Sequence, residues 1–148
     1  MRSKSLLALM EQLVMVLVFA LAAALCLQVF VFSQRVSKQN EAMDRAVMEC
    51  QRAAETLKAA GGDMAHAQKT AMTQMGGQLS QGVWCVSYDA QWNVTENGES
   101  GVYLLAARGQ PAPVEGLCRA DVWVCEEESG EQLFSLTVAW QEVGGNGT

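Results

Sequence analysis

Hydrophobic and polar residues divide the chain into three stretches of different pattern. Residues 6–32 form a run of twenty-seven residues that is apolar almost throughout, and its one acidic member is Glu11. About 20 apolar residues are enough for a helix to cross the hydrocarbon of a bilayer. The first stretch therefore predicts a membrane-spanning helix near the N-terminus.

The second stretch, residues 33–60, predicts an amphipathic helix. Apolar residues recur there at spacings of seven, four, three, four and three, which places them on one helical face. These residues are Val36, Met43, Val47, Cys50, Ala54 and Leu57. Because no proline or glycine occurs before Gly61, we expect one continuous helix that ends at Gly61-Gly62. Asp63 is a candidate N-cap for a short second helix over residues 63–75.

The third stretch has the alternating texture of strands. It predicts strands over residues 82–88, 101–107, 117–126 and 132–142, with an acidic hairpin turn at 127–131. The fold class is therefore α+β, with a long N-terminal helix packed on a small antiparallel sheet. The boundaries are a basic leader (1–6), a transmembrane helix (7–32), an amphipathic extension (33–60), a head domain with about four strands (61–143) and a flexible tail (144–148).

The basic residues beside the apolar run bear on its orientation. Arg2 and Lys4 lie in a very short flank and favour a cytoplasmic N-terminus, against the weaker signal of Arg35 and Lys38 on the far side. Residues 22–24 are three alanines and resemble a signal-peptide cleavage site. Cleavage there would leave an apolar N-terminus, so we expect an uncleaved single-pass anchor in the cell membrane with the C-terminal domain extracytoplasmic.

Charge and side-chain chemistry exclude several function classes. Residues 61–148 hold three basic and eleven acidic residues, a net charge of −8, whereas nucleic-acid binding needs a basic surface. The single histidine, His66, and the lack of any CxxC pair predict no metal site and no cofactor. No catalytic triad or carboxylate pair stands out, so we expect a protein that is not an enzyme.

The cysteines outside the apolar run are candidates for disulfides in an extracytoplasmic domain. Cys118 and Cys125 are seven residues apart on one predicted strand and face opposite sides of it. They cannot bridge each other. Cys118 faces the predicted core, where Cys50 on the helical stripe is its candidate partner, and Cys85 with Cys125 is the other candidate pair. Packing as free thiols is the alternative to both pairs.

A basic leader, an apolar helix with a glutamate near its start, an amphipathic extension and a small sheet form a recognisable combination. It resembles the type IV pilin and type II secretion pseudopilin superfamily, and residues 7–14 (LALMEQLV) followed by the apolar run carry the likeness. The resemblance implies a pilin-like fold and a minor pilin or pseudopilin role in a type IV pilus or type II secretion assembly. Its partners would be the membrane, other pilin-like subunits through the N-terminal helix, and a prepilin peptidase.

The resemblance also assigns roles to particular residues. It makes Glu11 the fifth mature residue, which aids assembly, and places cleavage and N-terminal methylation between Leu6 and Leu7. The chain departs from the family there, since Leu6 stands where glycine is usual and Leu7 where phenylalanine is usual. Two other interpretations stay open: Glu11 reaches the membrane interface without a partner, or the chain is a bitopic sensor or adaptor that does not polymerise.

Overall fold

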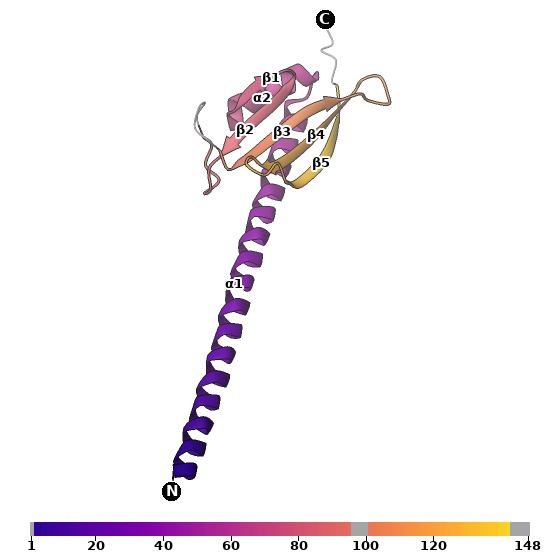
Figure 1. Ribbon diagram of the computed structural model, residues 1–148. Coiled ribbons are helices and arrows are strands. Elements are labelled where there is room, and N and C mark those ends of the chain that lie inside the picture. Colours follow the sequence, from indigo (N-terminus) through magenta and orange to yellow (C-terminus); the bar gives the residue numbers. More distant parts are fainter. Residues whose placement is uncertain (1, 96–100, 143–148) are drawn as a thin grey trace, which may run out of the picture. The chain divides into compact units, whose positions relative to one another are not determined.

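A computed structural model describes residues 2–95 and 101–142 and confirms the α+β class (Figure 1). The chain forms two compact units, Met1–Glu41 and Ala42–Thr148. Helix α1 (Arg2–Ala60) contains every described residue of the first unit and the opening residues of the second. The predicted tail, residues 144–148, lies outside the described residues.

The first unit consists of helix alone, as its lack of proline and glycine predicts. Its apolar side chains are exposed, among them Leu13, Phe19 and Phe32. The helix is long and apolar enough to cross a membrane, and none of its most hydrophobic window is buried within the protein. Residues 2–95 and 101–142 therefore contain one candidate membrane span, near the N-terminus.

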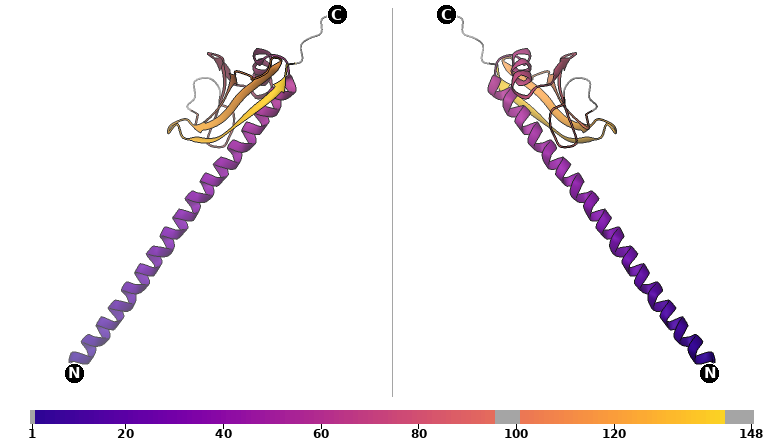
Figure 2. Two further views of the ribbon diagram at one scale, coloured as in Figure 1. Left: turned by 90° about the vertical axis from the view of Figure 1, so that its right-hand side faces the viewer. Right: turned by 90° about the vertical axis from the view of Figure 1, so that its left-hand side faces the viewer.

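The second unit holds a five-stranded antiparallel sheet in which consecutive strands are neighbours. Its strands are β1 (Gln78–Ser80), β2 (Val83–Tyr88), β3 (Tyr103–Gln110), β4 (Leu117–Glu126) and β5 (Gln132–Gln141). Figure 2 shows them from two opposite sides as one curved layer. Helix α2 (Met64–Met75) begins at the predicted cap, where the backbone N–H of His66 donates to Asp63 Oδ1 at 2.8 Å.

Strand β1 is absent from the sequence-based prediction of about four strands. Its three residues are all exposed, so they show no alternation of buried and exposed positions. It exists because a two-residue turn returns the chain onto β2, with positive φ at both Gln81 (50°) and Gly82 (78°). Positive φ at both central residues is the mark of a tight hairpin turn.

The core lies between one face of the sheet and the two helices. Buried side chains alternate along β2 and β4, with Trp84, Val86 and Tyr88 buried on β2, whereas β3 buries the three consecutive residues Leu105, Ala106 and Ala107. Helix α2 adds Ala67, Ala71 and Met75 to this core.

The helical stripe that meets the sheet differs in part from the predicted one. Cys50, Ala54 and Leu57 are buried as expected, but Ala46 and Ala53 are buried beside them, Val47 is half-buried and Met43 is 43% exposed. Val36 belongs to the first unit and is 39% exposed. Alanines lie on the face of α1 that meets the sheet because their small side chains permit the closest approach of a helix to a sheet.

Candidate functional site

Glu11 lies on the exposed surface of α1 among apolar side chains. It lines a shallow depression together with Lys4 and the apolar residues Leu7, Ala8, Met10, Val14 and Met15. Leu7 and Val14 are 69% and 52% exposed, so this face is free to meet another helix. A carboxylate in such surroundings is expensive within a bilayer unless it finds a partner.

The residues of the predicted processing junction lie inside the helix. Leu6 and Leu7 are in the first turns of α1, and their side chains are 66% and 69% exposed. The junction is thus at the surface of the first unit. Cleavage between these two residues stays a prediction.

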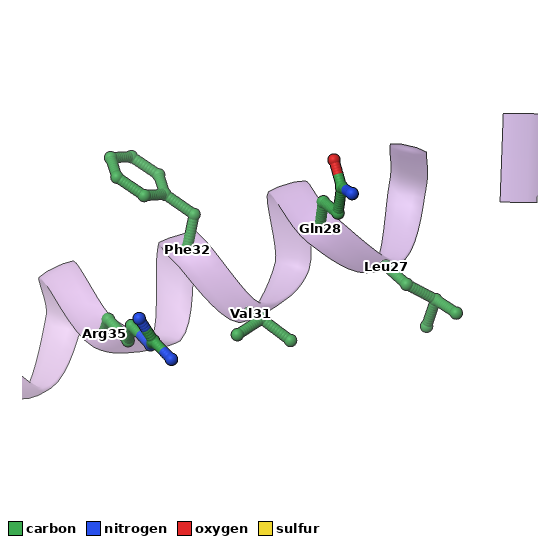
Figure 3. A pocket seen from close by; sticks show the side chains of 5 residues that line it. All are labelled: Leu27, Gln28, Val31, Phe32 and Arg35. Atoms are coloured by element: carbon green, nitrogen blue, oxygen red, sulfur yellow. The ribbon is translucent and has the colours of Figure 1, made fainter. Parts of the chain in front are cut away.

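A second shallow depression on α1 brings Gln28 together with Arg35. It is lined by Leu27, Gln28, Val31, Phe32 and Arg35. Figure 3 shows Gln28 and Phe32 along one flank of the helix and Leu27 and Val31 along the other. The seven-residue spacing of Gln28 and Arg35 could have revealed this pairing, because residues seven apart nearly share a helical face.

In the second unit, α1 is tied to the sheet by a buried phenol. The Tyr88 hydroxyl donates to Glu49 Oε2 at 3.1 Å, and Arg52 Nη1 lies 3.9 Å from the same oxygen. Burial, followed by the neighbouring Glu49 carboxylate, raises the pKa of Tyr88 well above its usual value. This pair fixes the rotation of α1 against strand β2.

The four cysteines of the head are all free thiols in this structure. Cys118 faces the helices, where its Sγ lies 3.6 Å from the Gly62 carbonyl oxygen, and Cys50 is fully buried in the core. Burial, with a smaller effect of Glu49, raises the pKa of the Cys50 thiol to about 12.

Sheet geometry argues against the predicted Cys85–Cys125 bridge. Cys85 pairs with Ala106 of β3 and Cys125 pairs with Leu104 of β3, so strand β3 lies between the two cysteines. Strands two places apart are separated by roughly 9–10 Å, beyond the roughly 7 Å between Cα atoms that a disulfide tolerates. As predicted, Cys118 and Cys125 face opposite sides of β4.

Trp92 lies in the turn after β2 with a φ of +65°. Its indole stacks on the Tyr103 ring at 4.3 Å between centroids and lies 5.7 Å from the Tyr88 ring. This aromatic cluster closes one end of the core.

The remaining polar groups of the head have structural partners or face solvent. His66 is exposed. Gln68, 3% exposed, donates through Nε2 to the carbonyl oxygens of Gly82 and Ala107 at 2.9 and 3.3 Å. Within residues 2–95 and 101–142 no cluster of three or more His, Cys, Asp or Glu could hold a metal ion.

Comparison with known proteins identifies no relative of this chain. No protein-family model, curated protein or solved structure matches the chain. The structure brings Lys4 and Glu11 to one surface depression and holds Cys50, Cys85, Cys118 and Cys125 as free thiols. Glu11 is therefore the strongest candidate functional group.

Proposed function

We propose that this protein is a membrane-anchored, non-catalytic assembly subunit similar to a minor pilin or pseudopilin. The observation that carries the proposal is Glu11, a carboxylate exposed on the apolar surface of a helix that could span a membrane. A buried charge without a partner is strongly unfavourable, so a cationic group on a neighbouring subunit would stabilise association.

The packing of α1 in the second unit also supports the proposal. Helix α1 contributes Ala46, Cys50, Ala53 and Leu57 to the core of the second unit, so Glu11 lies on the same helix that packs against the sheet. In this proposal the anchor and the head act as one subunit, with the N-terminus in the cytoplasm and the head extracytoplasmic. Arg2 and Lys4 in the short N-terminal flank support that orientation.

Replacement of Glu11 tests the assembly role directly. Full-length chains with two different tags are expressed together in membranes and treated with a membrane-permeant cross-linker. Glu11→Gln is expected to lower the yield of cross-linked oligomers about tenfold, because the amide keeps the shape and removes the charge. Glu41→Gln is the matched control, since Glu41 is an exposed glutamate of the same helix outside the apolar run.

The two outcomes separate the candidate functions. If Glu11→Gln assembles as well as the unmodified chain, the assembly role is wrong and a bitopic adaptor that does not polymerise becomes the better interpretation. The N-terminal mass of the membrane-extracted protein is an independent measurement. A methylated Leu7 terminus would show pilin-type processing, whereas an intact Met1 would show that Glu11 acts in an unprocessed chain.

A further inference from the structure

Among the polar residues of α1 near and within the apolar run, four lie on one seam of the helix, namely Lys4, Glu11, Gln28 and Arg35, whereas Gln12, Ser33 and Gln34 lie off it. Residues spaced by seven form one row of this seam, which comprises Lys4, Glu11, Val18, Leu25 and Phe32. The adjacent row begins at Leu7 and ends with Gln28 and Arg35. These two rows are the a and d positions of a heptad pattern, whose face drifts by only about 20° per seven residues on a straight helix.

The seam contains two polar pairs with the same spacing. Lys4 and Glu11 are seven residues apart and share one surface depression, and Gln28 and Arg35 are seven residues apart and share another (Figure 3). Seven residues of α-helix correspond to roughly 10.5 Å along the axis. The one ion pair among the described residues joins Glu49 and Arg52, so Lys4 and Glu11 do not pair within the chain.

We propose that the partner of this seam is a second copy of the same chain, shifted along the helix axis by seven residues. In that register Lys4 of the shifted copy reaches the depth of Glu11, and Gln28 of the shifted copy reaches the depth of Arg35. The ammonium donates to the carboxylate, and the guanidinium donates to the amide oxygen. One shift satisfies both pairs.

The alternative register, with two copies level, is unfavourable at the same positions. It places Glu11 against Glu11, Lys4 against Lys4 and Arg35 against Arg35 across a two-fold axis. Like charges in a medium of low dielectric repel strongly. A shifted contact is heterologous, because it joins different parts of the seam on the two copies. Each copy therefore keeps one part of its seam free for a further copy, and the assembly can extend without closing.

The inference rests on the proposed assembly function and specifies its register and its cation. It assigns the cation for Glu11 to the Lys4 side chain, which requires that residues 1–6 remain on the chain. The polar residue Gln12 lies off the seam at the next position and serves as the internal comparison.

Cross-linking between copies tests the register. Two full-length chains, both carrying Cys26→Ser, are expressed together, one with Val18→Cys and the other with Leu25→Cys. The shift brings residue 25 of one copy to the depth of residue 18 of the other. We expect the mixed 18–25 disulfide to exceed the 18–18 and 25–25 disulfides about tenfold after oxidation in membranes.

Charge exchange tests the pairing. Lys4→Glu alone and Glu11→Lys alone are each expected to reduce cross-linked oligomers about tenfold, and the chain carrying both changes is expected to recover most of the yield. Gln28→Leu is expected to reduce the yield several-fold, while the identical change Gln12→Leu leaves it unchanged.

Failure of this inference can be distinguished from failure of the proposed function. Predominant 18–18 and 25–25 disulfides would show association in a level register and overturn the shift alone. A mature chain that begins at Leu7 would remove Lys4 and overturn its role, while supporting pilin-like processing. If copies do not associate and Glu11→Gln has no effect, the proposed function fails together with the inference.

Discussion

Replacing Gly77 by alanine tests how closely the segment after α2 approaches strand β2. Gly77 has a φ of +87°, and a Cβ atom placed there would lie 2.2 Å from the Cys85 carbonyl oxygen and 2.8 Å from Val86 Cγ2. The neighbouring Gly76 carbonyl accepts a hydrogen bond from Trp84 Nε1 at 2.9 Å. An alanine would therefore push this segment away from β2 and lengthen that hydrogen bond.

Gly82 offers a matched control, because it has a φ of +78° and nothing within 4 Å of an added Cβ. In both variants the left-handed backbone costs about 1–2 kcal/mol for alanine. In Gly77→Ala the overlap with β2 adds about 1–3 kcal/mol, the usual cost of forcing atoms into a packed region. We expect Gly77→Ala to lower the free energy of unfolding by about 2–5 kcal/mol and Gly82→Ala by about 1–2 kcal/mol.

Urea unfolding of the full chain in detergent micelles, followed by tryptophan fluorescence, measures the difference. With a slope of about 1–2 kcal/mol per molar urea, an extra 2 kcal/mol lowers the midpoint by roughly 1–2 M. Equal midpoints for the two alanine variants would refute the argument from the close approach. A lower slope for Gly77→Ala would instead show that the compactness of its native or denatured state has changed.

Three further predictions concern the head. Leu57→Ala should cost about 2–5 kcal/mol, because Leu57 is fully buried, whereas Met48→Ala, at a position 58% exposed on the same helix, should be nearly neutral in urea unfolding. Tyr88→Phe should cost about 1 kcal/mol through loss of the hydrogen bond to Glu49, and the Glu49→Gln, Tyr88→Phe double-mutant cycle should show coupling between the two. Since the pKa of Cys50 is raised from 9.0 to about 12, the unfolded chain loses this proton first, so stability should fall as pH rises from about 9 toward 12. Cys50→Ala should lessen that fall without abolishing it, because the pKa of Tyr88 is also raised; an unchanged pH dependence would contradict the assignment to Cys50.

The larger elements could be predicted from the sequence because each has a strong local signal. The apolar run, the glycines after Ala60 and the alternation in β2, β4 and β5 depend on near neighbours in the chain. The predicted strand over 117–126 coincides with β4, and the cap at Asp63 is observed. These features follow from periodicity and backbone preference alone.

The remainder depends on contacts that only the assembled sheet creates. Strand β1 has no apolar pattern and exists because a tight turn presents it to β2. Ala46 and Ala53 are buried while the larger Met43 is exposed. Which residues of α1 become buried depends on which face of the helix approaches the sheet most closely. The spacing of Cys85 and Cys125 could not be judged without knowing that β3 lies between them.

The meander order of the sheet also has a consequence for how the chain is made. The core that buries Ala46, Cys50 and Leu57 of α1 includes Val122 and Val124 of β4. At about 5–20 residues per second, synthesis from Leu57 to Val124 takes roughly 3–13 s, during which this stripe lacks its full cover. Because Ala46 and Ala53 have small side chains, they expose little apolar surface in that interval.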